Sequence, residues 1–514
     1  MMKKVLKLLT SRRTFVIILL LLQVYFILFL LIESNARLHA FSITLNVISI
    51  AAVVYIINRK DKPAYKITWI IMIMAVPLFG GILYLMFRLQ SSVERLQRRF
   101  SKYDVQALAL LKQDDGILKK LQEENRDIAL QAQYLIGKSG YPIYRNTGVE
   151  FMPSGERYFS RLTDELKKAE HFIFLEFFII SSGVMWDEIL DILKEKARSG
   201  VDVRVIYDDM GCMFSLPHKY YRTMNALGIK CLAFNPFRPF WTTLQNNRDH
   251  RKIAVIDGVT AFTGGINLAD EYINAIKRFG HWKDSAVMLH GEGVRSFTVM
   301  FLNMWDSVSR SEENFNDFLL PVNEGSYRDS DKIGYVHPYC DSPVDNEYIG
   351  ENVFLQIINN ARKYIYISTP YLIIDDNIMS SIMLAAKSGI DVRIITPFIP
   401  DKKIVHMNTR SGYVRLIDSG VRLYEYRPGF IHSKNFISDD TTAVTGTANL
   451  DFRSLYLHFE CGVRMYNVPA ISDIKADFLK TLEDCTEIKS DFYAGKNIAI
   501  RIFKNIIRLF APFM

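Results

Sequence analysis

The chain has 514 residues, 49% of them hydrophobic, and a formal net charge of +8 at pH 7. Because single hydrophobic cores stop growing at roughly 250–300 residues, this length indicates more than one domain. The five cysteines have neither CxxC nor zinc-ligand spacing, which indicates free thiols in a chain that needs no disulfides. The basic charge is compatible with two classes of partner, nucleic acid and an anionic membrane surface.

Three apolar segments lie near the N-terminus, at about 14–33, 41–57 and 67–87. A spanning helix needs ~20 apolar residues, and the first segment meets that length. A cleaved signal peptide is the alternative, but the first segment is too long for one and lacks a small-residue cleavage site. The third segment is interrupted by Pro77 and Gly80-Gly81. We therefore predict that residues 1–87 form a multi-pass segment with transmembrane helices in the cell membrane.

Basic residues flank these segments, and Lys and Arg concentrate on the cytoplasmic side of membrane proteins. One basic cluster precedes the first segment, one lies between the second and the third, and one follows the third from Arg88 onward. Three full spans would place the last cluster outside. A helical hairpin over 14–57, followed by a segment over 67–87 that enters the membrane and turns back at Pro77, keeps every cluster inside. This arrangement predicts a cytoplasmic catalytic region.

The remainder of the chain has the pattern of an α/β protein. Residues 88–135 are charged with helical periodicity, and we interpret them as a juxtamembrane linker. A continuous apolar strand is expected at 171–180, a helix at 185–199 and a second strand at 201–207. This order predicts a parallel sheet covered by helices.

The second half of the chain repeats this plan. Residues 388–395 match 199–206 almost one for one, and 361–368 echo the first apolar strand. We therefore predict a duplicated α/β unit with halves at 136–320 and 321–490. The C-terminal segment 491–514 places basic residues among apolar ones near helical spacing, which suits an amphipathic helix at a membrane surface or one packed against the domain.

Each half contains one motif that reads His-x-Lys-x4-Asp, with a glycine seven residues after the Asp and an Asn three residues further on. Side chains two residues apart in a strand point to the same face, so the His and Lys of each motif share a face. This pair suits a phosphate, because the Lys binds the anion while the His attacks or protonates it. An isolated His is more often an ordinary core or surface residue, but two matching copies strongly favour catalysis. The residues are His250, Lys252, Asp257 and Asn267 in the first half and His432, Lys434, Asp439 and Asn449 in the second.

The pair of motifs resembles the twin HKD signature of the phospholipase D superfamily. Its wider context, including the segments 263–267 and 445–449, is similar to the bacterial cardiolipin synthase family from about residue 41 to the C-terminus. This resemblance implies a duplicated phospholipase D-like α/β fold, in which two mixed or parallel sheets flanked by helices pack about a pseudo-twofold axis. Both HKD strands then meet at one active site.

Two further acids align through the repeat. Asp284 and Glu460 occupy matching positions after the two motif Asn residues. A carboxylate that binds the far nitrogen of an imidazole selects its tautomer and raises its basicity. By resemblance, these acids are candidates for orienting the two histidines. An ordinary surface acid at the start of a strand is the alternative.

The resemblance also divides the motif residues by role. The lysines and the two Asn residues are expected to stabilise charge on phosphoryl oxygens, whereas Asp257 and Asp439 are expected to stabilise the motif structurally. His250 is favoured as nucleophile and His432 as general acid and base, although the repeat alone does not distinguish them. The implied reaction transfers a phosphatidyl group between two phosphatidylglycerol molecules through a phosphohistidine, giving cardiolipin and glycerol.

No metal cluster is visible in the sequence, and two Lys and two His can supply the positive charge, so we expect no metal and no other cofactor. The expected partners are phosphatidylglycerol and anionic membrane lipids rather than nucleic acid. The oligomeric state stays open.

Three other functions share part of this sequence pattern. A hydrolytic phospholipase D, or a phosphatidyltransferase that uses another alcohol, would share the motifs. A superfamily nuclease fits the basic charge but has no need of membrane segments. A catalytically inactive scaffold would require loss of a motif residue, and none is lost. Asp249 and His458 depart from the family pattern, which has Asn at both positions, and neither change removes a proposed chemical group.

Overall fold

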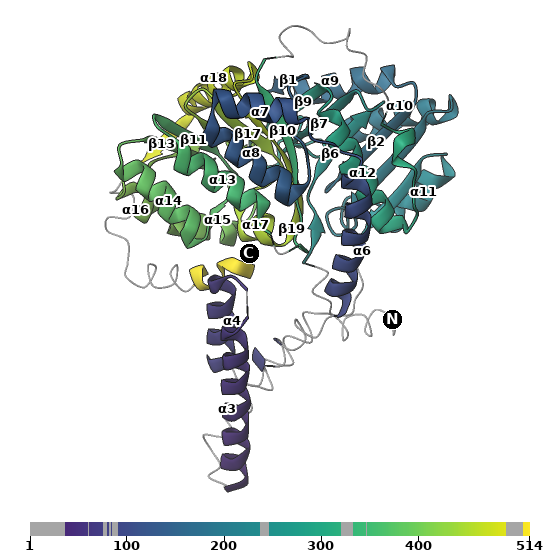
Figure 1. Ribbon diagram of the computed structural model, residues 1–514. Coiled ribbons are helices and arrows are strands. Elements are labelled where there is room, and N and C mark those ends of the chain that lie inside the picture. Colours follow the sequence, from purple (N-terminus) through teal and green to yellow (C-terminus); the bar gives the residue numbers. More distant parts are fainter. Residues whose placement is uncertain are drawn as a thin grey trace. The chain divides into compact units, whose positions relative to one another are not determined.

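The computed structural model describes residues 36–59, 61–75, 80–81, 84, 91–236, 246–319, 333–345, 347–489 and 507–513 (Figure 1). The membrane segment predicted at 14–33 and most of the C-terminal helix predicted at 491–514 lie outside these residues. The chain divides into two compact units. The smaller unit takes in residues 1–96, 237–246 and 505–514, and the larger unit takes in residues 97–236 and 247–504.

The smaller unit is built around α3 (Ala36–Ile57) and α4 (Pro63–Ala75), and it also contains the short helix η6 (Ala511–Phe513). The predicted segment 41–57 falls within α3, and the predicted segment 67–87 overlaps α4, whose last residue is Ala75. Within the described ranges, no helix combines the length and the apolar character needed to cross a membrane. The prediction of several full spans is therefore not supported by this part of the chain.

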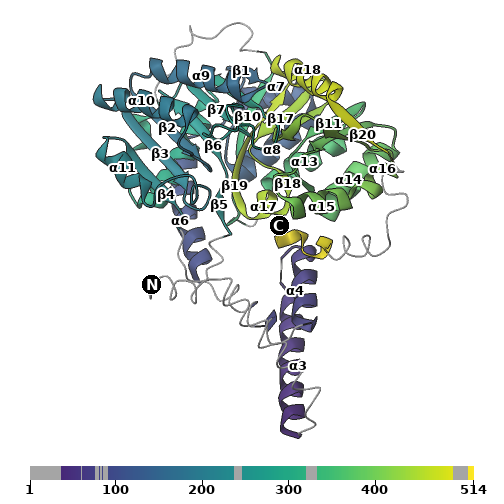
Figure 2. The same cartoon turned by 180° about the vertical axis from the view of Figure 1, so that it is seen from behind.

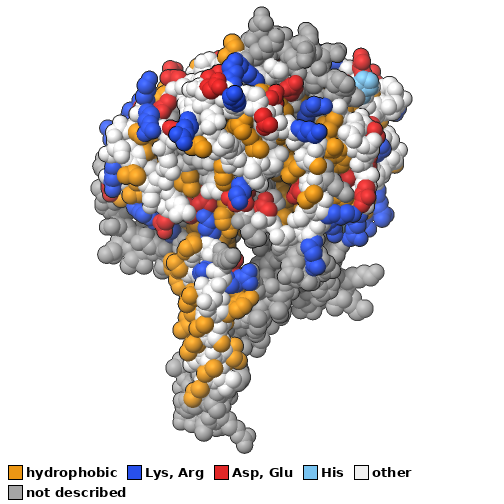
Figure 3. Space-filling view, viewed as in Figure 1, with side chains coloured by type: hydrophobic (Ala, Val, Ile, Leu, Met, Phe, Trp, Pro, Cys, Tyr) orange, Lys and Arg blue, Asp and Glu red, His pale blue; other side chains and the backbone are white. Residues whose placement is uncertain are grey.

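Both helices of the smaller unit expose aliphatic side chains. Among the described residues, Ile56 of α3 and Ile73 of α4 form a small buried cluster with Tyr84. Orange side chains run along the surface of α3 and α4 in Figure 3. An exposed apolar surface of this kind marks an interaction with lipid or with protein. The exposed residues are Ile43, Val47, Ile48, Ile50, Val54, Ile57, Ile67, Ile71 and Met74.

The larger unit contains two mixed sheets whose strands follow the same order (Figures 1 and 2). In order across the first sheet, the strands are β1 (Thr147–Met152), β9 (Ala286–Gly291), β7 (Thr260–Gly264), β6 (Lys252–Ile256), β2 (Phe172–Phe177), β3 (Asp202–Asp208) and β4 (Lys230–Phe234). Across the second, they are β10 (Tyr335–Asp341), β19 (His458–Tyr466), β17 (Thr442–Gly446), β16 (Asn435–Ser438), β11 (Tyr364–Ser368), β13 (Asp391–Pro397), β14 (Arg422–Tyr426) and β20 (Cys485–Ile488). The predicted duplication therefore extends to the topology of the sheets.

Helices connect and flank these strands. The strand, helix and strand predicted at 171–180, 185–199 and 201–207 are confirmed as β2, α10 and β3. The sheets are mixed rather than parallel, because tight turns join β6 to β7 and β16 to β17 and make each of those pairs antiparallel. The helices are α6 (Ser91–Leu108), α7 (Asp115–Glu124), α8 (Arg126–Ser139), α9 (Gly155–Lys168), α10 (Val184–Arg198), α11 (Tyr220–Ala226), α12 (Val294–Ser309), η2 (Phe315–Asp317), α13 (Ile349–Asn360), α14 (Asp376–Lys387), α15 (Lys403–Ser411), α16 (Tyr413–Ile417), α17 (Phe452–Tyr456) and α18 (Ala470–Glu483).

Short parallel strand pairs join the two halves just before the motif histidines. The backbone N–H of His250 donates to the carbonyl of Phe459 at 3.0 Å, and that of His432 donates to the carbonyl of Lys283 at 2.7 Å. Each accepting residue directly precedes one of the two predicted orienting acids. The pairing strands are β5 (Arg248–Asp249) with β19, and β15 (Gly429–Ile431) with β8 (His281–Lys283); a third pair, β12 (Leu372–Ile373) with β18 (Leu450–Asp451), lies within the second half.

The motif aspartates close the opposite ends of the motif strands. The carboxylate of Asp257 accepts hydrogen bonds from three backbone N–H groups at 170–172, at 2.7–2.8 Å. Asp439 accepts three from residues 362–364, at 2.6–3.0 Å. Both aspartates have left-handed backbones, with φ of 51° and 56°. Each therefore fastens the turn after its motif strand to the start of the neighbouring strand.

Replacing Asp257 by Ala should lower the free energy of unfolding by about 2–4 kcal/mol, because three hydrogen bonds are lost and Ala is strained at positive φ. Asp257→Asn should cost less, since Asn keeps one acceptor oxygen and tolerates this backbone. Denaturant unfolding of the purified proteins measures both. Equal stability of Asp257→Ala and the wild type would refute the anchoring role, as would loss of activity in fully folded Asp257→Asn.

Candidate active site

Each motif histidine is hydrogen-bonded to a carboxylate of the opposite half. The Nδ1 atom of His250 lies 2.8 Å from Oε1 of Glu460, and Nδ1 of His432 lies 2.7 Å from Oδ2 of Asp284. All four side chains are buried. In the neutral imidazole, a proton on Nδ1 is donated to the carboxylate, so Nε2 keeps its lone pair. This arrangement suits a nucleophile or a general base.

The motif lysines fold back over their own histidines. Lys252 Nζ donates to the carbonyl of His250, and Lys434 Nζ donates to the carbonyl of His432. Burial lowers the pKa of Lys252 to about 8 and the pKa of Lys434 to about 7, although nearby carboxylates oppose the shift. Both ammonium groups are held where an anion would relieve their desolvation.

The two histidine–carboxylate pairs differ electrostatically. Burial raises the pKa of Glu460 to about 7, whereas His432 and Lys434 outweigh burial at Asp284 and hold its pKa below the usual value. Burial and Lys434 lower the pKa of His432 to about 4, with Asp284 opposing. Burial and both lysines hold the pKa of His250 well below its usual value. Both imidazoles are therefore neutral in the empty site at neutral pH.

The rings around the two histidines also differ. Three aromatic rings surround His432, with centroids 5.3–5.9 Å away, whereas His250 faces Phe178 at 4.9 Å and His458 at 5.4 Å. These neighbours could not be predicted from the sequence, because a buried aromatic residue of a site has the same sequence pattern as any core aromatic. The rings next to His432 belong to Tyr272, Trp282 and Phe430.

The two motif Asn residues are not equivalent in the structure. Asn267 accepts from the N–H of Ile179 at 3.0 Å and donates to the Tyr272 hydroxyl at 2.7 Å. Asn449 donates only to Asp451, at 3.3 Å, and its buried Oδ1 has no hydrogen-bond partner among the described residues. The amide of Asn267 is thus engaged in holding the loops of the site, while that of Asn449 is less committed.

The two motif aspartates lie away from the histidines and lysines. Asp257 and Asp439 lie at the far ends of their strands and bind backbone, so of each HKD triplet only the His and Lys belong to the cluster. Thr447, within the segment 445–449 that carries the resemblance, donates to Glu460 and was not predicted. It leaves Glu460 bonded through both carboxylate oxygens.

One group among the described residues has the spacing of a metal site. Single ligand atoms of His250, His458 and Glu460 lie within 4.8 Å of one another. The His250–Glu460 hydrogen bond already occupies two of these groups, and the neighbouring Lys252 disfavours a further cation. Both buried ring nitrogens of His458 lack a hydrogen-bond partner in the described part of the chain. The Nδ1 atom of His458 lies 3.9 Å from Oε1 of Glu460.

Comparison with known proteins places these features in context. Residues 162–305 and 354–482 match the protein family described as "Cardiolipin synthase, PLD-like domain", and residues 47–88 match the family described as "Phospholipase_D-nuclease N-terminal". A protein without assigned function from Streptococcus mutans is 44% identical over 90% of this chain and 100% of its own length. A cardiolipin synthase from a Geobacillus species is 34% identical over 92% of this chain and 93% of its own length.

Solved structures give the fold independently. The phosphatidylserine synthase of Haemophilus influenzae superposes with a TM-score of 0.55 at 14% sequence identity, covering 71% of this chain and 95% of that protein. At this identity the likeness shows the architecture alone: a mixed α/β phospholipase D-like fold with two sheets.

The lysine pKa values predict how kcat/KM for a phosphodiester substrate depends on pH, because kcat/KM reports groups of the free enzyme. Beyond the effect of the His432 pKa of about 4, it should fall more steeply as the pH rises through about 7 to 8, where first Lys434 and then Lys252 lose their charge. Lys434→Arg stays charged, so its decline should begin only near pH 8. A wild-type profile that is flat to about pH 9 would show that neither charge is needed.

Proposed function

Since the chain belongs to the cardiolipin synthase family with phospholipase D-like domains, we propose that it transfers a phosphatidyl group from one phosphatidylglycerol to another. The products are cardiolipin and glycerol. The observation that carries the proposal is the pair of buried neutral imidazoles, each oriented by a carboxylate and accompanied by a lysine. In this proposal the halves at 136–320 and 321–490 each supply one histidine, and each supplies the acid that orients the other's histidine.

The first step forms a covalent intermediate. Nε2 of His250 attacks phosphorus, the bond to the glycerol oxygen breaks, and protonated His432 gives its proton to that oxygen. His432 becomes protonated on substrate binding, because the anionic phosphodiester raises the pKa of an adjacent imidazole. Lys252 and Lys434 stabilise the charge on the phosphoryl oxygens.

The second step regenerates the enzyme. His432, now neutral, takes the proton from the terminal hydroxyl of a second phosphatidylglycerol. That oxygen attacks phosphorus, and the bond between phosphorus and His250 breaks. Asn449, whose Oδ1 has no hydrogen-bond partner among the described residues, is a suitable acceptor for a polar group of the incoming head group.

The difference between the two carboxylates supports the proposed assignment of the histidines. Asp284 has a lowered pKa and stays ionised, so it supports the imidazolium that His432 must form. Glu460 has a pKa raised to about 7 and gives less support to an imidazolium at His250. This supports His250 as the nucleophile, whose lone pair must stay free.

Lipid association accompanies this chemistry. The exposed aliphatic side chains of α3 and α4 suit attachment to the membrane that contains the substrate. The cytoplasmic placement of the catalytic part stays a prediction from the basic clusters.

The second candidate is hydrolysis, in which water replaces the second lipid. The same histidines and lysines would serve it, so the acceptor alone separates the two reactions.

Purified protein incubated with phosphatidylglycerol alone should produce cardiolipin and glycerol in equal amounts. His250→Ala and His432→Ala should each reduce the rate roughly 10³-fold or more. His218→Ala, which changes an exposed histidine, is the matched control and should not affect it. Phosphatidic acid without cardiolipin would establish hydrolysis instead.

A phosphodiester with a p-nitrophenol leaving group should distinguish the roles of the two histidines, because this leaving group needs no general acid. His432→Ala should then form the covalent intermediate but lack the base that resolves it, so label accumulates on the peptide that contains His250. Mass spectrometry of the digested protein locates it. Label on His432 in a His250→Ala protein would reverse the assignment.

A further inference from the structure

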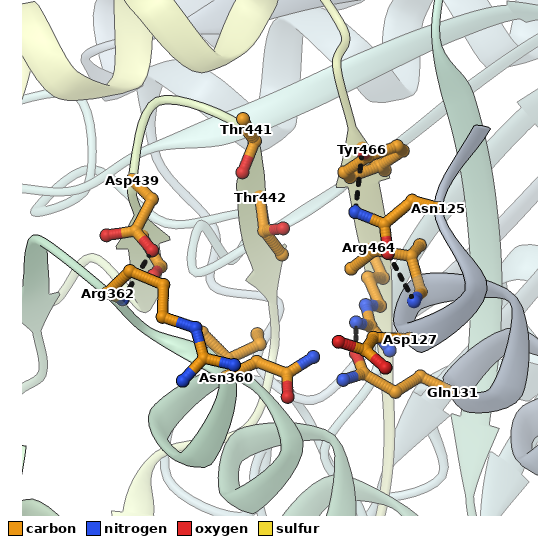
Figure 4. A pocket seen from close by; sticks show the side chains of 13 residues that line it. Asn125, Asp127, Gln131, Asn360, Arg362, Asp439, Thr441, Thr442, Arg464 and Tyr466 are labelled. Carbon is orange, nitrogen blue, oxygen red and sulfur yellow. Dashed lines mark hydrogen bonds between the residues drawn. The ribbon is translucent and has the colours of Figure 1, made fainter.

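A second polar pocket lies in the larger unit, away from the two histidines. It has a volume of about 180 Å³ and is walled by the start of α8, the end of α13, the β16–β17 turn and β19 (Figure 4). Asp439 also lines it, and Asp439 marks the end of β16 opposite to His432. The pocket is therefore not part of the catalytic site.

Arg464 is the unusual residue of this pocket. It is only 4% exposed, and its guanidinium donates to the side-chain carbonyls of Gln131 and Gln356. Among the described residues, no carboxylate oxygen lies within 4 Å of it, so neutral groups are its only partners. Burial lowers the pKa of Arg464 to about 10, which leaves it charged at neutral pH. A buried charge without a counter-ion is costly and is normally paired.

The fold itself does not require this charge. Arg464 is the fourth residue after Glu460 on β19, and the fourth residue after Asp284 on β9 is Met288. The two strands occupy the same place in their sheets. The first half thus fills the equivalent position with a buried apolar side chain, whose sulfur accepts from Arg161 at 3.5 Å, whereas the second half places a cation there that lines the pocket.

Other groups around the pocket favour an anion. In Figure 4, Arg362 and Asn360 reach in from one side, and Gln131 and Arg464 from the other. The first turn of α8, a helix of 14 residues, forms part of the wall and adds the partial positive charge of its N-terminus. Of the two acids present, Asp439 is held by three N–H groups and Asp127 is exposed.

We propose that this pocket binds a small anion through a phosphate group, held by Arg464 and Arg362. Guanidinium groups bind phosphate with paired hydrogen bonds. The pocket is smaller than the roughly 300–1,000 Å³ of sites for drug-sized ligands, so it suits a single phosphate or glycerophosphate group. The proposal does not depend on the reaction catalysed at the two histidines.

Calorimetric titration of inorganic phosphate into the detergent-solubilised full chain tests the proposal. A Lys434→Ala background weakens the catalytic site, so that the second site dominates the signal. Binding should persist in this background and in a Lys363→Gln control, which removes an exposed cation next to Arg362. It should weaken about tenfold or more in Arg362→Gln, and it should be lost in Arg464→Met, which copies the residue of the first half.

Thermal unfolding gives a second readout. Without phosphate, Arg464→Met should melt at or above the wild-type temperature, because an uncompensated buried charge is removed. Phosphate should raise the melting temperature of the wild type and leave that of Arg464→Met unchanged. If Arg464→Met fails to fold, the exposed Arg362→Gln change still decides.

Two competition experiments identify the source of the phosphate group. One adds glycerol 3-phosphate to the titration with inorganic phosphate, and the other adds phosphatidylglycerol micelles. Competition by glycerol 3-phosphate supports the site and identifies a free metabolite as its ligand. Competition by phosphatidylglycerol supports the site and identifies a lipid head group. Unchanged phosphate binding in both Arg362→Gln and Arg464→Met would overturn the proposal, and so would absence of phosphate binding in the Lys434→Ala background.

Discussion

Each motif imidazole is oriented by a carboxylate that the other half of the chain provides. His250 bonds to Glu460 and His432 bonds to Asp284, and the short strand pairs just before the histidines bring each couple into register. Neither half can orient its own histidine. The matching sheets, the exchanged strands and the burial of the site are therefore parts of one arrangement, in which the proposed active site is the interface between the halves.

Burial at that interface determines the electrostatics. Two lysines and two histidines are withdrawn from water together, so all four lose affinity for protons, and an anion entering the site reverses the loss. Nearby carboxylates oppose this, and the two that bond to the imidazoles differ, because Asp284 stays ionised while Glu460 approaches neutrality near pH 7. The two halves thus have nearly the same backbone, but their histidine–carboxylate pairs differ in proton affinity. Such a difference suits a reaction with two successive steps that need different protonation states.

Much of this could be predicted from the sequence, because the motif and the repeat are local patterns. The spacing identified the histidines and lysines, and the register of the repeat identified Asp284 and Glu460. The exchange of these acids between halves could not be predicted, because it depends on how two distant segments pack. Asn267 shows the same limit, since the residue was singled out but its amide is engaged by Ile179 and Tyr272. In the smaller unit, the apolar runs predicted a helical hairpin over 14–57 and a re-entrant segment over 67–87, whereas no described helix combines the length and the apolar character of a membrane span.

The exchange of acids also has a consequence in time. His250 and Glu460 are 210 residues apart in the chain. At synthesis rates of about 5–20 residues per second, roughly 10–40 s separate their appearance at the ribosome. During that interval the first histidine has no orienting partner, and a truncated product would never acquire one. A nascent chain that is already close to lipid thus lacks an oriented His250 until the second half has been synthesised. The order of synthesis therefore disfavours premature cleavage of phospholipid.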